Sequence, residues 1–342
     1  MARIDELRLM AKIARLYHVQ GIRQVEISQR LRIHQSTVSR MLRRAETAGI
    51  VRTTVSAPPG IHSEIEERLE TVFGLKQAIV VETGVDEDQI ARELGGAAAY
   101  LIESTVKGNE VIGISCWSHA LLAMVNALQP ARGGGGGKVV QILGGVGNPG
   151  VQSHATLLTQ RLAHLLMATP VLLPAPGVVG SRAARNVLLS DRYVQQAFSL
   201  FPHLDIALVG IGALEPSKML RSSGNFFGSE DLRVLSQAGA VGDICLQFFD
   251  AHGAPVRSAI GSRVIGMQLQ ELKQTPLVIA VAGGQRKVGA ILGALRGGWI
   301  NTLITDHGVA EALLAREGPP DRAAASQAGM PGSAQQEEPR PN

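Results

Sequence analysis

The stretch QVEISQRL (residues 24–31), followed after three residues by QSTVSRML (residues 35–42), decides the fold of the N-terminal part of the chain. Both stretches place apolar residues at helical spacing, and the gap between them suits a tight turn. Two helices that cross steeply need apolar residues at the crossing, and these are Val25, Ile27, Leu31, Ile33, Val38 and Leu42. The pattern predicts a helix-turn-helix whose second helix keeps one face free for the major groove of DNA.

The exposed face of the second helix carries residue types that read DNA. At 100° per residue, Ser36, Arg40, Arg43 and Thr47 fall on the side opposite Val38. Small hydroxyl side chains suit base edges, and arginines suit guanine or phosphate. We expect base contacts from Gln35, Ser36 and Arg40, phosphate contacts from Thr37, Ser39, Arg43 and Arg44, and a further DNA contact from Gln24. An ordinary helical hairpin with an exposed basic face is the alternative interpretation.

The turn and the ends of this motif also have sequence signals. Arg32 stands in the turn, where glycine is common, and His34 occupies the N-cap of the second helix, where Ser or Asp is the stronger choice. Residues 49–55 are rich in β-branched side chains and predict a strand, which would be the wing of a winged domain. The sequence APPG at residues 57–60 then ends the domain.

Charge is concentrated at the same end of the chain. Residues 1–52 contain eleven Lys and Arg against four Asp and Glu, a net charge of +7, whereas the whole chain carries +4. The remaining residues are therefore mildly acidic. A basic N-terminal part (the head, residues 1–52) on a mildly acidic remainder (the body) fits attraction of the head to a nucleic-acid phosphate backbone. A solvated helical surface is the alternative explanation of the same charge.

Length and composition allow one small domain and one large domain. The chain has 342 residues, of which 45% are hydrophobic and 18% charged, as in a well-packed protein. Its two cysteines, Cys116 and Cys245, lie in apolar runs and are expected to be buried free thiols rather than a disulfide. No window approaches the length of a transmembrane span and the N-terminus has no signal-peptide core, so we expect a cytoplasmic protein without a membrane partner.

The rest of the chain alternates short apolar strands with helices. The strands are expected at residues 78–81, 111–115, 139–143, 171–173, 205–210, 277–282 and 300–305, and the helices at 88–106, 118–128, 152–168, 287–296 and 307–315. This alternation predicts a Rossmann-like α/β domain with a largely parallel sheet. The predicted domains are a helix-turn-helix at 1–56, a linker helix at 57–75, an effector domain at 76–315 and a disordered tail at 316–342.

Three glycine clusters follow predicted strands: GGVGN at 144–148, GIG at 210–212 and GG at 283–284. At the carboxyl edge of a parallel sheet, glycine lets the backbone approach a ligand, and the amides there favour an anion. Strand-to-helix turns also need glycine, so one cluster alone says little. The candidate effector-binding residues are Gly144, Gly145, Asn148, Gly210, Gly212, Asp243, Gly283, Gly284 and Lys287.

Three charged residues near these clusters each have two interpretations. Lys287 could neutralise a phosphate, or it could simply be a surface lysine. Asp243 lies in an apolar run and could accept hydrogen bonds from two sugar hydroxyls, or it could cap a turn. We favour the ligand-binding role for both. For Asp306 we favour a structural role, as the cap of the last helix.

The sequence resembles the SorC family of sugar-responsive regulators. In the head, the matching residues are Tyr17, 24–27, 37–45 and 48–51; in the body, they are 205–214, 239–245, 278–287 and 294–306. The resemblance implies a fold similar to sugar-phosphate isomerases and glucosamine-6-phosphate deaminase, used for sensing. It also implies oligomers, usually tetramers, and an effector held near Gly144, Gly145, Asp243 and Lys287. Residues 114–121 (ISCWSHAL) depart from the family pattern of Trp-Gly followed by Thr, which changes a candidate pocket wall.

Three functions are weighed on these residues. The first is a transcription regulator without a cofactor, a homo-oligomer (dimer or tetramer) that binds operator DNA and a sugar or sugar-phosphate effector. The second is a sugar-phosphate isomerase or deaminase with an accessory head; Asp243 or His119 could be its base, but no acid–base pair is visible. The third, a dinucleotide-binding oxidoreductase, fails because Glu215 stands where the fingerprint needs a third glycine. We predict a regulator, not an enzyme.

Overall fold

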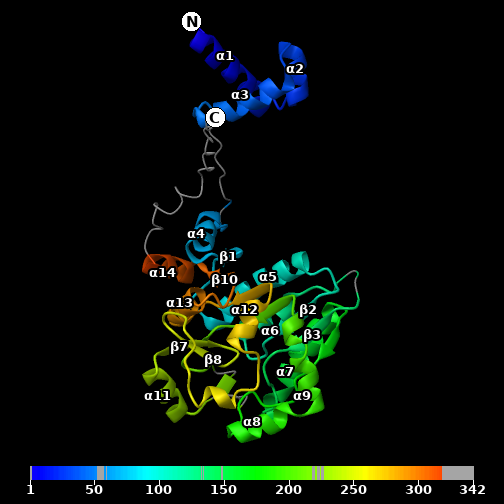
Figure 1. Cartoon of the computed structure of the whole chain (residues 1–342), viewed down its shortest axis with the longest axis vertical. Coiled ribbons are helices and arrows are strands. Elements are labelled where there is room, and N and C mark those ends of the chain that lie inside the picture. The colour runs from blue at the N-terminus through cyan, green and yellow to red at the C-terminus, as the bar shows by residue number, and fades with distance from the viewer. Residues whose placement is uncertain are drawn as a thin grey trace, which may run out of the picture. The chain divides into compact units, whose positions relative to one another are not determined.

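The chain forms two compact units, Met1–Pro58 and Pro59–Asn342, in a computed structural model. The structure describes residues 2–51, 58, 60–131, 133, 135–147, 149–217, 220–221, 224 and 227–317. Figure 1 shows the helices α1, α2 and α3 of the smaller unit and the mixed helices and strands of the larger one. Each unit has its own hydrophobic core.

The smaller unit is a helix-turn-helix preceded by a long first helix. Its elements are α1 (Ala2–Ala14), a π-helical turn (Arg15–Val19), α2 (Gln24–Leu31) and α3 (Gln35–Thr47). The buried core is formed by Met10, Ile13, Ala14, Leu16, Ile27, Val38, Met41, Leu42 and Ala45. Val25, which we expected at the helix crossing, is exposed, so Ile27 is the buried contact that α2 makes. Because these side chains fix α3 by one face, its other face is free for a partner.

The turn between α2 and α3 explains two residues that looked unusual in the sequence. Arg32 adopts the left-handed conformation, with φ of 52°, which is why glycine is common at this position. His34 is the N-cap of α3, as predicted: its Nδ1 accepts a hydrogen bond from the Ser36 amide and lies 2.8 Å from the Ser36 hydroxyl. The Ser36 side chain is thus engaged in the cap.

The strand predicted at residues 49–55 is not seen in the part of the smaller unit that the structure describes. Gly49 takes a φ of +70° and, with Ile50 and Val51, forms a turn after α3. The amides of Ile50 and Val51 both donate to the Ala45 carbonyl, at 2.9 and 3.1 Å, and so satisfy the helix end. Residues 52–57, where most of the predicted strand falls, lie outside the described residues.

A parallel sheet forms the centre of the larger unit, as predicted. Within the described residues it has seven strands in the order β1-β10-β9-β5-β2-β3-β4, and every neighbouring pair is parallel. The strands are β1 (Gln77–Val81), β2 (Val111–Ile114), β3 (Lys138–Gln141), β4 (Thr169–Val171), β5 (Ile206–Val209), β9 (Leu277–Val281) and β10 (Thr302–Asp306). The strands β5 and β10 are buried along their whole length, as expected for a sheet covered on both faces.

Helices connect these strands and complete the core. They are α4 (Ser63–Phe73), α5 (Glu87–Thr105), α6 (His119–Ala127), α7 (Pro149–Leu165), α8 (Arg182–Leu189), α9 (Arg192–Phe198), α11 (Ser229–Gln237), α12 (Leu269–Gln274), α13 (Val288–Arg296) and α14 (His307–Glu317). Short 3-10 turns lie at Phe201–His203, Gly261–Arg263 and Gln285–Lys287. In the part of the chain that the structure describes, no helix is long and apolar enough to cross a bilayer.

Helix α4, predicted as a linker, is packed into the larger unit. Its Leu69 is fully buried in the main core. Two of its carboxylates accept hydrogen bonds from the edge strand β1: Glu70 from the Ala78 amide at 2.8 Å and Glu66 from the Val80 amide at 2.9 Å. The helix therefore lies along β1 (Figure 1) and covers the backbone donors of that edge.

A small antiparallel sheet was not predicted. It contains β6 (Gly212–Ala213), β7 (Ala240–Ile244) and β8 (Gln247–Asp250). A two-residue turn joins β7 to β8, with Cys245 and Leu246 at positive φ values of 53° and 60°. Such turns favour Asn-Gly, so the Cys-Leu pair gave no signal in the sequence. At the other end of the unit, α14 runs to Glu317, and residues 318–342 of the predicted tail lie outside the described residues.

Candidate functional site

A cavity of about 680 Å³ lies at the carboxyl ends of the parallel strands. The residue that follows each of five strands lines it: Glu82 after β1, Ser115 after β2, Gly210 after β5, Ala282 after β9 and His307 after β10. Open α/β sheets bind their ligands at this edge, and the volume is within the range of about 300–1,000 Å³ for small-molecule sites. The cavity is thus the best candidate site among the described residues.

Two ionisable groups of opposite sign, one buried and one half-buried, face this cavity. Asp243 comes from β7, and Lys287 ends the 3-10 turn that follows β9. Burial raises the pKa of the Asp243 carboxyl to about 6, although the Leu246 amide and the charge of Lys287 both lower it. Burial also lowers the pKa of Lys287, and the neighbouring Arg286 lowers it further. A ligand that brings hydroxyls to Asp243 and an anion to Lys287 would offset the cost of keeping both groups ionised.

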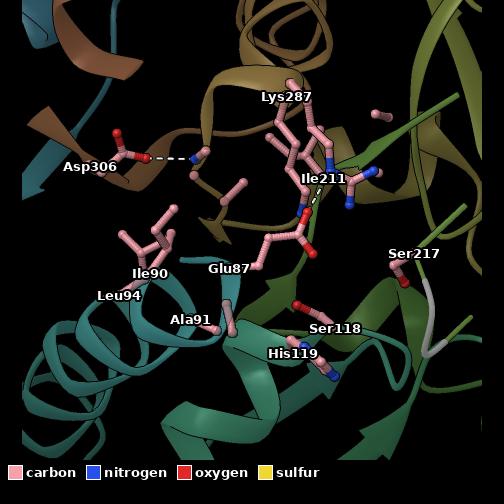
Figure 2. A pocket seen from close by; sticks show the side chains of 18 of the residues that line it. Glu87, Ile90, Ala91, Leu94, Ser118, His119, Ile211, Ser217, Lys287 and Asp306 are labelled. Carbon is pink, nitrogen blue, oxygen red and sulfur yellow. Dashed lines mark hydrogen bonds and ion pairs between the residues drawn. The ribbon is translucent and has the colours of Figure 1, made fainter. Parts of the chain in front are cut away.

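A second pair of opposite charges stands beside them. Figure 2 shows Glu87 reaching from α5 toward the turn that carries Lys287. The Glu87 carboxylate is 3.0 Å from Nε of Arg286, and both residues line the cavity. Glu87 also favours the charged form of Lys287, as Asp243 does, so the lysine has a carboxylate from each of two elements nearby. The pair is partly exposed, so its contribution to stability is small, about 0–1 kcal/mol.

Asp306 holds the last glycine turn of the cavity in place. Its Oδ1 accepts from the Val309 amide at 3.0 Å, which is the helix cap we expected, and its Oδ2 accepts from the Gly284 amide at 2.7 Å (Figure 2). A Cβ atom at Gly283 would lie 2.4 Å from that Oδ2 and 2.8 Å from Leu94 Cδ1, so only glycine fits there. Asp306 thus joins β10 and α14 to the Gly283-Gly284 turn.

Replacing Asp306 with alanine should lower the free energy of unfolding of the larger unit by about 2–4 kcal/mol, because one buried and one half-buried amide lose a charged acceptor. Trp117 and Trp299 both lie buried in this unit, so urea denaturation followed by tryptophan fluorescence reports on it. Asp205→Ala is the matched control, since that more exposed carboxylate accepts one hydrogen bond, from the Val111 amide. A loss no larger than that of the control would show that Asp306 does not hold the turn.

Four of the predicted glycines line the cavity: Gly210, Gly212, Gly283 and Gly284. At Gly210 a Cβ atom would lie 2.9 Å from the Ser118 side chain, and at Gly212 it would meet Asp243 Oδ1. Glycine at these points therefore lets Ser118 and Asp243 approach the strand ends. The segment 114–121, predicted as a pocket wall, contributes Ser115, Trp117, Ser118, His119 and Ala120 to the lining.

The first glycine cluster has a packing role instead. Gly144 and Gly145 are buried and do not line the cavity. A Cβ atom at Gly144 would lie 2.4 Å from the Pro176 carbonyl oxygen, and the Gly144 amide already donates to Ile265. A Cβ atom at Gly145 would lie 2.6 Å from Ala155 Cβ. The expectation that these two glycines hold an effector is therefore not supported by their positions, and Asn148 lies outside the described residues.

The candidate DNA-binding residues divide by exposure. Gln35, Ser36, Arg40, Arg43 and Arg44 are exposed, whereas Gln24, Thr37 and Ser39 are half-buried. Arg44, which we expected near a phosphate, donates from Nη1 to the Glu6 carboxylate of α1. This hydrogen bond and charge hold the pKa of Glu6 below its usual value. Arg44 thus links α3 to α1. A phosphate bound by Arg44 would have to share its guanidinium group with Glu6.

Comparison with known proteins places this arrangement in a family. The model of the Sugar-bind family, a sugar-binding domain, matches residues 58–315, which contain the whole cavity. The sorbitol operon regulator of Klebsiella pneumoniae is 32% identical over 319 residues, 92% of this chain and all of that protein. The chain belongs to the SorC family of sugar-binding transcriptional regulators.

Other comparisons agree with the family. The deoxyribonucleoside regulator of Bacillus subtilis (strain 168) is 33% identical over 91% of this SorC-family chain and 98% of its own length. The crystal structure of the full-length regulator SorC from Klebsiella pneumoniae superposes with a TM-score of 0.69 at 30% identity. That match covers 90% of this chain and 99% of the other. The predicted resemblance is confirmed, and so is the predicted fold.

Sequence reasoning missed several polar residues of this SorC-family cavity. Glu82, Glu87, Ser217, Arg286 and His307 line it, and none was a candidate. Figure 2 shows Ser217 on the side of the cavity away from α5. For Glu82 and His307 a signal existed: each directly follows a strand, within two residues of a predicted strand end, at the edge where ligands bind. The sequence prediction rested on the glycine clusters and on Asp243, Lys287 and Asp306, so it did not include these two residues.

Proposed function

We propose that this chain binds operator DNA through α3 and that a carbohydrate or phosphorylated carbohydrate in the cavity changes its affinity for that DNA. The observation that carries the proposal is the cavity itself, in which the buried Asp243 carboxyl group and the half-buried Lys287 ammonium group face a space of sugar size. Carboxylates accept hydrogen bonds from sugar hydroxyls, and lysine neutralises phosphate. The relatives named as regulators of sorbitol and deoxyribonucleoside operons support a carbohydrate-type effector.

The proposed effector acts through a difference in affinity. The effector must have different affinities for the arrangement that binds the operator and the arrangement that releases it. Equal affinities would leave the equilibrium between the two arrangements unchanged. We propose a homo-oligomer, dimer or tetramer, because paired heads would read two half-sites on one face of the DNA. Gly283, Gly284, Asp243 and Lys287 are the effector contacts we propose, together with Gly210 and Gly212 in the wall.

We also propose that the chain senses its ligand without converting it. The relatives are named as regulators. Asp243, the carboxyl group with the raised pKa, accepts a hydrogen bond from the Leu246 amide at 2.9 Å through Oδ2 and so is part of its own turn. His119, the other candidate base, is half-exposed and 3.7 Å from Asp88. Isomerisation would need a base and an acid placed on the same substrate.

Fluorescence anisotropy with the DNA upstream of the gene tests the proposal. We expect specific binding at physiological salt and a shift of about 5–150-fold in affinity with one member of a panel of sugars, polyols and their phosphates. Scrambled DNA of the same length is the control. Absence of specific binding with every ligand would reject the regulator, and turnover of a sugar phosphate by the same preparation would favour the enzyme.

A further inference from the structure

A second cluster of polar side chains lies at the rim of the cavity. His62, Glu82 and His307 each bring one ligand atom into a group whose members are all within 4.8 Å of one another. His62 is the residue before α4, Glu82 follows β1, and His307 begins α14. Two imidazoles and a carboxylate, drawn from three separate elements, thus converge on one point in the described part of the chain.

The fold brings these residues together for reasons visible in the sequence. Along α4, every fourth residue faces β1: Glu70 binds the Ala78 amide and Glu66 binds the Val80 amide. Four helical residues and two strand residues span similar lengths, about 6 Å and 6.6 Å, so the next step of the row pairs His62 with Glu82. The distance between His62 Nε2 and Glu82 Oε1 is 2.9 Å.

His307 is added to the pair by the sheet. In the parallel register of β1 and β10, Val81 stands beside Asp306. The next residue of each strand is Glu82 and His307, so they are neighbours at the same carboxyl edge. The rings of His307 and His62 lie with their centroids 4.5 Å apart. The placement therefore follows from backbone register, not from a chance contact of mobile side chains.

One buried nitrogen of the cluster has an ion-pair contact but no hydrogen bond to the part of the chain that the structure describes. Nε2 of His62 is buried, and within the described residues it has no hydrogen bond, although Glu82 Oε1 is 2.9 Å away. A buried polar nitrogen without a hydrogen bond costs about 1–3 kcal/mol, and an ion is one ordinary explanation for it. The His62 nitrogen and the Glu82 oxygen are thus in an ion-pair contact without hydrogen-bond geometry, and both atoms are close enough to bind one shared ion.

We propose that His62, Glu82 and His307 bind a divalent transition-metal ion of the Zn²⁺ type. Imidazole and carboxylate are ligands that Zn²⁺ accepts, and sets of three protein ligands leave a fourth position open. Bonds of about 2.0–2.1 Å bring tetrahedral ligand atoms about 3.4 Å apart, so small side-chain rotations from the observed spacing suffice. Glu82 and His307 also line the cavity, so the open position is available to water or to a ligand oxygen there.

A fourth residue, which is acidic, lies beside the cluster. Glu311, one turn further along α14, has its carboxylate 3.7 Å from Nε2 of His307. Carboxylates next to a metal-binding histidine orient its ring and raise its basicity. The site also stands at a special place in the chain, because His62 is only four residues beyond Pro58, where the smaller unit ends. A bound ion would fasten the start of the larger unit to β1 and α14.

The test is metal binding by the full-length chain. The protein is stripped with EDTA, exchanged into metal-free buffer and titrated with Zn²⁺ against a chromophoric chelator. We expect one equivalent per chain, and a loss of affinity of at least about tenfold in Glu82→Gln and in His307→Gln, since even losing a supporting partner costs that much. His203→Gln, at an exposed histidine outside the cluster, is the matched control and should bind as the parent does.

A spectrum gives a second readout that a merely structural role would not produce. Co²⁺ in place of Zn²⁺ should give visible absorption of a low-coordinate site in the parent and in His203→Gln, and lose it in His307→Gln. Circular dichroism checks that each variant is folded. If Glu82→Gln does not fold, the metal affinity of His307→Gln alone decides the test. Failure of the parent to bind one equivalent, or equal affinity in the parent and both ligand variants, would overturn the site. Neither result depends on whether the cavity binds a sugar.

Discussion

An Asp243→Asn chain should bind its carbohydrate effector about 10–100-fold more weakly than the parent and should also be more stable at pH 7.5. The loss follows because hydrogen bonds to a charged acceptor contribute about 1.5–3 kcal/mol each. Asparagine keeps an oxygen for the Leu246 amide, which Oδ2 binds in the parent at 2.9 Å. The turn should therefore survive, and the change should act on the ligand. Titration of the effector by calorimetry measures the affinity.

The gain in stability follows from the raised pKa of Asp243. In the folded chain it is about 6, against an ordinary value of 3.8, because burial disfavours the charge. Between about pH 4 and pH 6 the folded state therefore holds more protons than the unfolded state. The contribution of Asp243 to the free energy of unfolding therefore falls as the pH rises through that window, and it stays low at higher pH. Asp243→Asn removes this fall, so its advantage over the parent should be absent at pH 4 and present at pH 7.5.

Urea denaturation at the two pH values, followed by the fluorescence of the two buried tryptophans, measures this difference. Lys287→Met is the companion variant. It should weaken the binding of a phosphorylated effector strongly and the binding of a neutral sugar little, because the lysine contributes a positive charge. Unchanged effector affinity in Asp243→Asn would show that the carboxyl group is a turn residue only. Equal stability of parent and variant at both pH values would contradict the buried, ionised state of Asp243.

The sequence predicted the parts of the fold that have strong periodicity. The parallel strands and their helices were expected within a few residues of their observed bounds, because buried strands such as β5 and β9 are continuous apolar runs. The β7–β8 hairpin was missed because its turn uses Cys245 and Leu246 instead of a glycine pair. Helix α4 was placed correctly along the chain, but its docking onto β1 depends on Glu66 and Glu70, which in the sequence look like surface acids.

The site was predicted only in part, and the reason is geometric. Asp243 stood out because a charge in an apolar run needs an explanation, and Lys287 because it follows the Gly283-Gly284 turn; both line the cavity. The glycines Gly144 and Gly145 have the same local sequence signal as Gly283 and Gly284, yet they fit against Pro176 and Ala155. Which glycine faces a ligand and which faces a neighbouring loop is decided by tertiary contacts. The metal-type cluster likewise depends on strand register between segments far apart in the chain.

An Arg40→Ala chain should bind its operator about 10–150-fold more weakly while its affinity for random DNA falls only slightly. Arg40 is exposed on α3, whose opposite face carries the buried Val38, Met41 and Leu42. One bidentate contact from arginine to guanine contributes about 1–3 kcal/mol of discrimination between base pairs. The specificity ratio should therefore fall almost as far as the operator affinity. Fluorescence anisotropy with operator and scrambled DNA, at several salt concentrations, measures both.

Two further arginines separate base reading from charge. Arg43→Ala, if Arg43 contacts a phosphate, should weaken binding to both DNAs alike and reduce the slope of log affinity against log salt by about 0.9. Arg30→Ala removes the same charge from α2, outside the proposed contacts, and is the matched control. If Arg40→Ala weakens operator and scrambled DNA equally, Arg40 is a phosphate contact too. Base reading would then rest on Gln35, since the Ser36 hydroxyl is already engaged by His34 in the helix cap.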